Sequence, residues 1–369
     1  MIRVGIVGIG TIAPKHLEGY ATFPGRCEIV ALADIIPERA RIAAACIGER
    51  VNAYSSHQEM LEAENIDLIS IATPPGSHAE IAIDSLAAGC HVLVEKPMAS
   101  GLDECDAMIS AASKANRLLS VVTPLRFTTD MMRMKEMLSR KVIGRILHAQ
   151  VDSFFWRGDN YYEMDWRGTW ESEGGGCTLN HAVHHIDLLL WLMGRPRELM
   201  ATMSNIAHGS SEVEDLAMAL LRFPEGALGV LTASLVHHGQ QQQLVFQGER
   251  ASLGVPYRCF ASEADPGGFP IQDESTESRL AALFDSLPTQ AHEMHTGQID
   301  NVLAAIDGLG ELVVDGVQGR DTIEFISALY KSAIARQPIE LPLDRADEFY
   351  TRSGLVAAAP RYKNGALNA

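Results

Sequence analysis

The stretch MIRVGIVGIGTIA, residues 1–13, decides the fold of this chain. Its apolar run predicts a strand over Arg3–Val7, and a GxGxxA turn follows that strand at once. The first glycine permits a tight turn, the second lets a phosphate approach the backbone, and the small alanine lets a helix pack on the strand. The N–H groups at the start of that helix favour an anion. The residues predicted to contact a dinucleotide here are Gly8, Gly10, Thr11 and Ile12.

A carboxylate at the end of the second predicted strand supports this interpretation. The strand Glu28–Ala33 leads into Asp34, about 26 residues after Gly8, where an acidic side chain typically binds the adenosine ribose hydroxyls. Such a carboxylate would repel a 2′-phosphate, so the sequence favours NAD over NADP. Two other interpretations stay open: Asp34 only caps the following turn, or Arg39 reaches a 2′-phosphate.

The first 120 residues alternate β-rich runs with segments of helical period. This βαβα order predicts an α/β Rossmann domain over residues 1–122, with a parallel sheet that helices cover on both faces. The predicted strands are Arg3–Val7, Glu28–Ala33, Leu68–Ala72, His91–Val94 and Leu118–Val122. The predicted helices are Ala13–Thr22, Pro37–Cys46, His57–Glu62, His78–Ala88 and Leu102–Ala115.

The remainder, residues 123–369, is predicted to be an α+β domain for substrate binding and oligomerisation. Strand-like runs joined by short turns indicate a large, mostly antiparallel open sheet. If one face of this sheet carries no helix, it needs a partner, and we expect a homodimer or homotetramer. The polar stretch Ala261–Ser278 is predicted to be a mobile loop. The predicted strands are Ile146–Phe155, Glu198–Asn205, Asp215–Phe223, Ala227–Leu235, Gln242–Gln247 and Ser252–Val255, and the predicted helices are Asp130–Arg140, Cys177–Met193, Thr296–Gly308 and Gly319–Arg336.

Composition excludes several classes of protein. Apolar residues make up 47% of the chain and charged residues 21%, which is ordinary for a soluble globular protein. The formal charge of −17, without a Lys/Arg-rich run, argues against nucleic acid as a partner. Apolar stretches such as Leu188–Met193 are too short to span a membrane. The six cysteines form no CxxC pair, so we expect reduced thiols and a cytoplasmic location.

A lysine follows another strand of the predicted sheet. The run HVLVEKP, residues 91–97, places Lys96 at the carboxyl end of a buried parallel strand. Open α/β sheets bind their ligands at that edge. Lysine is most often a solvated surface charge, and it is this location that singles Lys96 out.

Three motifs in order resemble one family. They are the turn Gly8–Ala13, the run Glu95-Lys96-Pro97, and the glycines 174–176 followed by Asn180, His184 and Asp187. Together they closely resemble the Gfo/Idh/MocA family, which includes glucose–fructose oxidoreductase and inositol dehydrogenases. The resemblance extends to Ile339–Pro342, which is similar to the last strand of the family.

The resemblance implies a role for each matching residue. Lys96 would lie beside the nicotinamide and stabilise the reacting substrate oxygen, and His184 would exchange its proton. Asn180 stands where many members have Asp; because an amide cannot take a proton, it would orient the substrate or His184. Further cofactor contacts implied by the resemblance are Thr73, Pro74, Pro75, His78 and Glu95. On local chemistry alone, residues 73–75 fit a plain turn equally well.

The histidine-rich helix leaves alternatives open. At about 100° per residue, Asn180, His184 and Asp187 share one stripe, and His181 and His185 share the next. His181 and His185 could bind zinc, but no third ligand accompanies them, so we predict no metal. Asp187 would either fix the tautomer of His184 or serve as a structural acceptor.

The resemblance adds substrate contacts before this helix. Arg126 follows the last Rossmann strand, and Trp166 and Arg167 precede the glycines. For both arginines a surface position is an equal alternative. The full set of predicted substrate contacts is Lys96, Arg126, Trp166, Arg167, Asn180, His181 and His184.

The function predicted from these residues is hydride transfer between nicotinamide and a secondary alcohol of a sugar, sugar derivative or cyclic polyol. The enzyme would be an NAD(P)-dependent dehydrogenase, with NAD preferred. One alternative is a glycoside hydrolase of the same fold that retains NAD. Another is a non-catalytic NAD-dependent sensor, which would need no proton acceptor such as His184.

Overall fold

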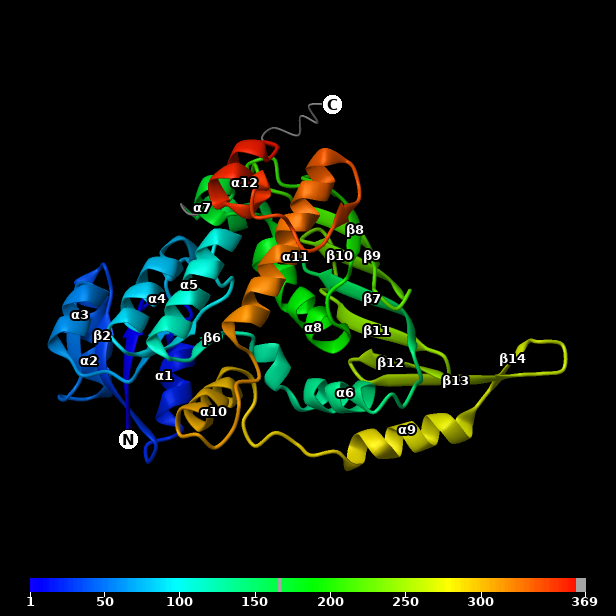
Figure 1. Ribbon diagram of the computed structural model, residues 1–369, viewed down its shortest axis with the longest axis horizontal. Coiled ribbons are helices and arrows are strands. Elements are labelled where there is room, and N and C mark those ends of the chain that lie inside the picture. Colours follow the sequence, from blue (N-terminus) through cyan, green and yellow to red (C-terminus); the bar gives the residue numbers. More distant parts are fainter. Residues whose placement is uncertain (165–166, 363–369) are drawn as a thin grey trace. The chain divides into compact units, whose positions relative to one another are not determined.

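The structure is a computed structural model that describes residues 1–164 and 167–362. It divides into two compact units (Figure 1). The first unit contains residues 1–127 and 290–323, and the second contains residues 128–289 and the chain from residue 324 onward. Helix α11 (Gly316–Ala335) contributes residues to both units. The sequence predicts a boundary at residue 122 and carries no signal for the return of residues 290–323 to the first unit.

The first unit is built on a six-stranded sheet in the order β3-β2-β1-β4-β5-β6. Every pairing in it is parallel, as the sequence predicts for a Rossmann fold. The strand order reverses between β1 and β4, which is where such sheets bind ligands. The strands are β1 (Ile2–Val7), β2 (Cys27–Ala33), β3 (Asn52–Tyr54), β4 (Leu68–Ile71), β5 (His91–Val94) and β6 (Leu119–Val121). Strand β3 was not predicted, because three largely exposed residues at a sheet edge carry no periodic signal.

Helices cover this sheet, and one of them comes from the returning segment. The helices are α1 (Ala13–Ala21), α2 (Pro37–Ile47), α3 (His57–Ala63), α4 (His78–Ala87), α5 (Leu102–Ala115) and α10 (Met294–Ile306). Ile299 and Leu303 of α10 belong to the same buried cluster as Ile6 and Leu32 of the sheet. A Cβ on Gly19 of α1 would lie 2.4 Å from Ile299 Cδ1, so α1 and α10 pack very closely. The returning segment is therefore part of the first core.

The second unit contains a nine-stranded sheet in the order β14-β13-β12-β11-β7-β10-β9-β8-β15. Only β7 and β10 pair in parallel, which confirms the prediction of a mostly antiparallel sheet. The strands are β7 (Ile146–Phe154), β8 (Glu198–Ser204), β9 (Leu216–Arg222), β10 (Leu228–Ser234), β11 (Gln242–Gly248), β12 (Ala251–Val255), β13 (Arg258–Ala264), β14 (Pro270–Gln272) and β15 (Ile339–Glu340). The helices are α6 (Thr129–Ser139), α7 (Trp170–Glu173), α8 (Val183–Met193), α9 (Glu274–Ser286) and α12 (Arg352–Ala358).

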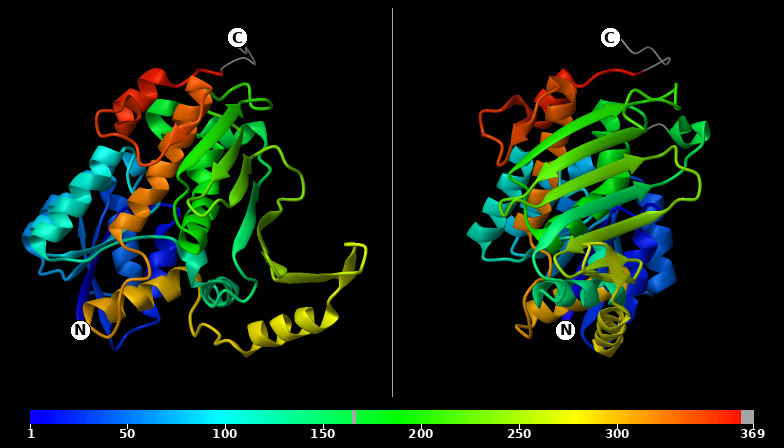
Figure 2. Two further views of the ribbon diagram at one scale, coloured as in Figure 1. Left: turned by 45° about the vertical axis from the view of Figure 1, so that its right-hand side comes forward. Right: turned by 90° about the vertical axis from the view of Figure 1, so that its right-hand side faces the viewer.

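The two faces of this sheet differ. Helix α8 packs on one face, where His185 Nδ1 lies 2.9 Å from the Ser153 hydroxyl of β7. Figure 2 (right) shows the opposite face toward the viewer, with the strands of the sheet uncovered. Met200, Leu220 and Val230 are paired across neighbouring strands there, and the Leu220 side chain is 64% exposed. An apolar row thus crosses the open face.

The prediction of a mobile loop over Ala261–Ser278 is wrong. Strands β13 and β14 form a hairpin in that region, and α9 begins directly after it. Asp265 Oδ1 accepts backbone N–H groups from Gly267 and Phe269, both over 2.8 Å, which closes the turn. Asp273 caps α9 by accepting the N–H of Thr276. The polar residues of this stretch therefore form the turn and the cap.

In the part of the chain that the structure describes, no helix combines the length and the apolar character needed to cross a membrane.

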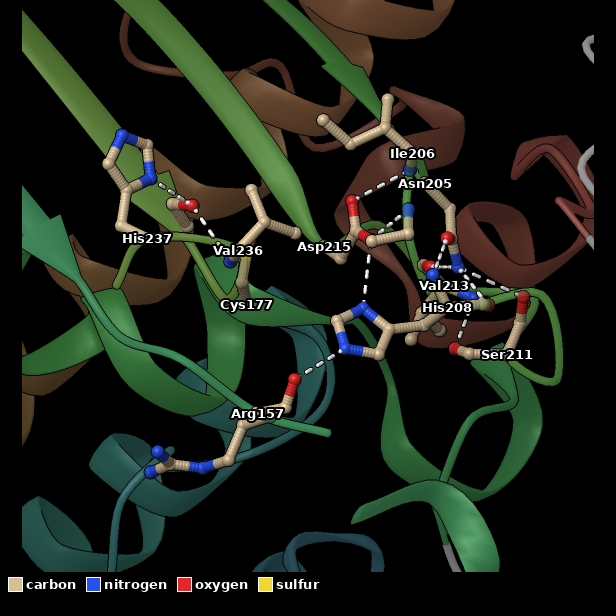
Figure 3. A network of polar contacts seen from close by, with 12 residues as sticks. Arg157, Cys177, Asn205, Ile206, His208, Ser211, Val213, Asp215, Val236 and His237 are labelled. Atoms are coloured by element: carbon tan, nitrogen blue, oxygen red, sulfur yellow. Dashed lines mark hydrogen bonds and ion pairs between the residues drawn. The ribbon is translucent and has the colours of Figure 1, made fainter. Parts of the chain in front are cut away.

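A buried ion pair fixes the loop between β8 and β9 (Figure 3). His208 Nδ1 lies 2.9 Å from Asp215 Oδ2, and His208 Nε2 lies 2.9 Å from the Arg157 carbonyl oxygen. A carboxylate and a carbonyl only accept hydrogen bonds, so the protonated ring satisfies both partners at once. Burial lowers the pKa of His208, but the Asp215 carboxylate and the Arg157 carbonyl outweigh it, and the pKa is raised above its ordinary value.

This ion pair makes stability depend on pH. Because the folded pKa of His208 is raised, the pair contributes fully below the unfolded value of about 6.5 and its contribution is lost as pH rises through the folded pKa. We expect His208→Gln to lower the melting temperature most at pH 6 and progressively less toward pH 9. Thermal unfolding of the wild type and of His208→Gln across this pH range measures the difference between their melting temperatures. The control is His238→Gln, which changes an exposed histidine. A difference in melting temperature that stays constant with pH would contradict the ion pair between His208 and Asp215.

Candidate active site

The glycine turn after β1 is held between neighbouring strands. Gly8 has φ +93°, and a Cβ there would lie 2.8 Å from the carbonyl carbon and oxygen of Ala72. Its N–H donates to the Ala33 carbonyl over 2.8 Å. Helix α1 begins five residues later at the fully buried Ala13, and no side chain caps its first turn. The backbone N–H groups there are oriented toward the carboxyl edge of the sheet, as a phosphate site requires.

The Asp34 carboxylate is hydrogen-bonded to this turn. Its Oδ2 accepts the N–H of Ile9 over 2.7 Å, and its Oδ1 accepts the N–H of Ile36 over 2.8 Å. The second contact is the turn cap that the sequence analysis gave as an alternative. A carboxylate offers about four acceptor positions, so these bonds leave capacity for ribose hydroxyls. The ribose contact of Asp34 stays a prediction.

Lys96 follows β5, half-buried, and its backbone is fixed by the residue before it. The Glu95 carboxylate is buried; Oε2 accepts the N–H of Lys96 over 3.2 Å, and Oε1 lies 3.0 Å from His16 Nε2 and 3.5 Å from His295 Nε2. Burial raises the pKa of Glu95, but the two histidines hold it well below its ordinary range. Glu95 was predicted to contact the cofactor. The structure shows a buried anion that positions Lys96.

His78 joins the loops that follow β4 and β5. Its ring is fully buried, with Nδ1 3.0 Å from the Pro97 carbonyl and Nε2 2.8 Å from the Thr73 carbonyl. Burial lowers the pKa of His78, and hydrogen bonds to the carbonyls of Thr73 and Pro97 oppose that shift. His78 is therefore held by protein carbonyls, and its predicted cofactor contact stays a prediction. Thr73 and Pro75 are half-buried and Pro74 is exposed.

Arg126, which was predicted as a substrate contact, is buried, and that contact stays a prediction. It lies in the turn η2 (Pro124–Phe127) and is 1% exposed. Its Nη1 donates to the Val313 carbonyl over 3.1 Å and to Gln318 Oε1 over 2.5 Å. A guanidinium at a buried turn satisfies its donors on nearby backbone, and this one joins residue 126 to the segment that returns to the first unit.

A buried glutamate that the sequence analysis missed organises the glycine triplet of the second unit. The Glu214 carboxylate accepts the N–H of Gly176 over 2.9 Å and the N–H of Thr178 over 3.0 Å. A Cβ on Gly176 would lie 1.8 Å from the Glu214 carbonyl oxygen, and one on Gly175 would lie 2.2 Å from the Tyr330 hydroxyl. The glycines indicated a close approach, but nothing in the sequence identified Glu214 as the partner.

The helix after the glycines does not begin as an α-helix. Residues Thr178–Ala182 form the π-helical turn η4, and α8 follows from Val183. The N–H groups of residues 176–178, which have no carbonyl partner in the helix, donate to Glu214. The predicted stripe of Asn180, His184 and Asp187 assumed a constant α-helical period, and the π-turn changes the offset of Asn180.

The candidate side chains of this helix differ in exposure. Asn180, His181 and His184 are half-buried, whereas His185 and Asp187 are buried. Asn180 Nδ2 donates to the Gly175 carbonyl over 2.7 Å, and His181 Nε2 lies 3.3 Å from the Tyr161 hydroxyl. Burial lowers the pKa of His185 to about 4. Asn180, His181 and His184 are thus the accessible members.

No cluster of metal ligands involves this helix, as far as residues 1–164 and 167–362 show. Only one group of three or more His, Cys, Asp and Glu side chains lies close enough in that part of the chain, namely His57, Glu80 and Asp84 in the first unit. Its His57–Asp84 contact of 3.0 Å is an ordinary hydrogen bond between α3 and α4.

The last predicted substrate contacts lie before the glycines. Trp166 is outside the described residues. Arg167 is half-buried; Nη1 lies 2.6 Å from Glu173 Oε1, and its guanidinium carbon lies 4.1 Å from the centre of the Tyr161 ring. Within the second unit the structure therefore brings Arg167 and His181 together around Tyr161.

Known proteins resemble this chain along most of its length. Residues 2–123 match the family described as "Oxidoreductase family, NAD-binding Rossmann fold", and residues 131–254 match "GFO/IDH/MocA C-terminal domain". The WlbA dehydrogenase of Bordetella pertussis, solved in complex with NADH and UDP-GlcNAcA, is 30% identical; the superposition covers 93% of this chain and 99% of that one, with a TM-score of 0.79.

Two curated relatives are also similar in sequence. Levoglucosan dehydrogenase of Pseudarthrobacter phenanthrenivorans is 28% identical over 73% of this chain and 79% of its own length. Myo-inositol 2-dehydrogenase of Thermotoga maritima is 26% identical over 77% of this chain and 82% of its own length. With both units matched in order by the family, the chain belongs to the Gfo/Idh/MocA family of oxidoreductases with an NAD-binding Rossmann fold.

Proposed function

We propose that this enzyme reversibly oxidises a secondary alcohol of a sugar, sugar derivative or cyclic polyol with NAD. The observation that carries the proposal is the position of Lys96, directly after β5 at the ligand-binding edge of the sheet, on a backbone that buried Glu95 holds. Relatives named as levoglucosan and inositol dehydrogenases support the class of substrate. The hydrolase and sensor alternatives find no specific support in the site.

The glycine turn fits the cofactor. A Cβ on Gly8 would meet the backbone of Ala72, whereas nothing lies within 4 Å of a Cβ on Gly10. One glycine is therefore required by the protein, and the other leaves open space above the turn, where a pyrophosphate needs close access. When bound, NAD supplies the hydride acceptor. Thr11, Ile12, Thr73, Pro74 and Pro75 are proposed as further contacts.

Side chains of the protein would accept the substrate's hydroxyl proton and stabilise the negative charge on its oxygen. The Lys96 ammonium would donate a hydrogen bond to the substrate oxygen and stabilise its developing negative charge. The His184 imidazole would accept the hydroxyl proton, because its ordinary pKa lies near neutrality. Asn180 has an amide nitrogen that already donates to the Gly175 carbonyl, so it would orient the substrate through its oxygen. His181 and Arg167 are proposed to bind the substrate elsewhere.

We further propose a homodimer or homotetramer formed through the open face of the second sheet. The row of Met200, Leu220 and Val230 across β8, β9 and β10 supports a second copy as its partner. A cytoplasmic location is proposed because all six cysteines are free thiols.

Gly10→Ala separates cofactor binding from folding. Because no protein atom lies near the added methyl group, we expect an unchanged melting temperature. The methyl group would obstruct the pyrophosphate, so the Kd for NADH should rise by about tenfold or more. Fluorescence titration measures the affinity, and Gly25→Ala, which also meets open space, is the matched control. Equal NADH affinity in both variants would refute the placement of the cofactor.

Lys96→Met and His184→Gln test the chemistry. Each should lower kcat by about 10²–10⁴-fold while leaving the Kd for NADH nearly unchanged. NADH absorbance with a panel of sugars and polyols follows turnover. If both residues act on one oxygen, the double variant should lose little more than either single variant.

The controls for this test are Lys114→Met and His238→Gln, which change exposed residues. They should keep wild-type kcat. Full activity in Lys96→Met and His184→Gln would defeat the roles proposed. Turnover of a glycoside without accumulation of NADH would favour the hydrolase alternative instead.

Leu220→Lys tests the assembly. A charge in the apolar row should prevent association, so sedimentation should show a smaller species than the wild type at the same concentration. Leu309→Lys, at a 79% exposed position of the first unit, should leave the mass unchanged. A wild-type chain that sediments as a monomer at all concentrations would overturn the proposal.

A further inference from the structure

Basic side chains converge on one tyrosine in the second unit. Tyr161 lies in the turn η3 (Asp159–Glu163), and the guanidinium carbons of Arg167 and Arg157 lie 4.1 Å and 5.4 Å from its ring centre. The Tyr161 hydroxyl lies 3.3 Å from His181 Nε2. We call these four residues, Arg157, Tyr161, Arg167 and His181, the Tyr161 cluster.

The cluster contains two cationic side chains, Arg157 and Arg167. Both guanidiniums are always protonated. Arg157 donates to uncharged oxygens, namely the Trp156 carbonyl over 2.8 Å and Gln240 Oε1 over 3.3 Å. Arg167 pairs with Glu173, whose buried carboxylate also accepts the N–H of Gly168 over 2.8 Å. Burial raises the pKa of Glu173 to about 7.

The cluster is accessible, and it is held in place. All four of its residues are half-buried. The Tyr161 N–H donates to the Gly158 carbonyl over 2.9 Å, and the Arg167 N–H donates to the Met164 carbonyl over 2.9 Å. His181 is the chain neighbour of Asn180 and shares the π-helical turn with it. A basic site in a chain with a formal charge of −17 therefore lies beside a residue that is proposed to orient the substrate.

We propose that the Tyr161 cluster binds an anionic group of the substrate, so that the preferred substrate is an acidic sugar, a sugar carboxylate or sugar phosphate. This inference rests on the proposed function and narrows its substrate class. A guanidinium presents parallel N–H donors that match the oxygens of a carboxylate or phosphate. Two guanidiniums close to one ring repel each other, and a bound anion would reduce that repulsion. The competing explanation is that the arginines only pack the loop on Tyr161.

Matched sugars test the inference. We compare three sugars, namely D-glucose, D-glucuronate and D-glucose 6-phosphate, and the corresponding galactose and mannose series. NADH formation measures their turnover, and calorimetric titration of the enzyme–NADH complex measures their affinity. We expect an acidic member to exceed its neutral parent by about tenfold or more in kcat/KM and in affinity. A higher value for the carboxylate or for the phosphate identifies the anionic group. Equal values for acidic and neutral sugars would overturn the inference.

The experiment distinguishes failure of the proposed dehydrogenation from failure of the proposed anion site. If no sugar is oxidised but the acidic sugars still bind more tightly than the neutral ones, dehydrogenation is wrong and the anion site stands. If only neutral sugars are oxidised, dehydrogenation stands and the anion site is wrong.

Variants assign the effect to the cluster. Two variants are compared: Arg157→Gln, and the double variant Arg167→Gln with Glu173→Gln, which leaves no buried charge unpaired. Each should raise the KM for the acidic sugar by about tenfold and the KM for the neutral sugar by less than about twofold. Arg157→Lys should restore part of the loss, because it keeps the charge without the planar fork. Arg140→Gln, an exposed arginine of α6, is the matched control.

Melting temperatures and the Kd for NADH show whether each variant is folded. If Arg167→Gln with Glu173→Gln does not fold, Arg157→Gln alone decides the test, because Arg157 has no buried ionic partner among its contacts above. Equal effects on acidic and neutral sugars, or no effect on either, would show that the cluster only packs the loop.

Discussion

The buried Glu95 carboxylate is the interaction on which the first unit depends. Its two oxygens are shared among His16 of α1, His295 of α10 and the backbone N–H of Lys96. An unpaired buried carboxylate would be very costly, so these partners must be in place for the unit to fold with Glu95 ionised. Helix α10 of the returning segment supplies one of these histidines. Folding and the position of Lys96 therefore depend on the same bonds.

The second unit uses a buried carboxylate in a similar way. Glu214 takes up N–H groups at the start of a helix, at the point where glycines let the backbone come close enough. It also accepts the Tyr330 hydroxyl over 3.0 Å. Burial raises the pKa of Glu214, and the N–H groups oppose that shift. In each unit, a buried carboxylate that is bonded to protein atoms fixes the backbone from which candidate functional side chains project.

The sequence predicted what local patterns specify. Continuous apolar runs identified the buried parallel strands, and the spacing after residue 8 identified the phosphate-binding turn. Features that depend on distant partners were missed. The returning residues 290–323 pack α10 against α1, and the N–H of Thr178 donates to Glu214, 36 residues away. The β13–β14 hairpin was read as a loop because its turn and cap residues are the polar types that loops also use.

Family motifs identify a neighbourhood more reliably than a contact. His78, Glu95 and Arg126 all belong to motif segments, yet the structure buries each of them against protein atoms. Their neighbours Thr73 and Lys96 remain half-buried. A buried polar side chain must be satisfied by fixed partners, so it maintains the shape of a site, whereas a half-exposed one can exchange water for a ligand. By this criterion Asn180, His181, His184 and Arg167 are the candidates for ligand contact among the described residues of the second unit. Two of them, His181 and Arg167, contact Tyr161 in the cluster that is proposed to bind an anion.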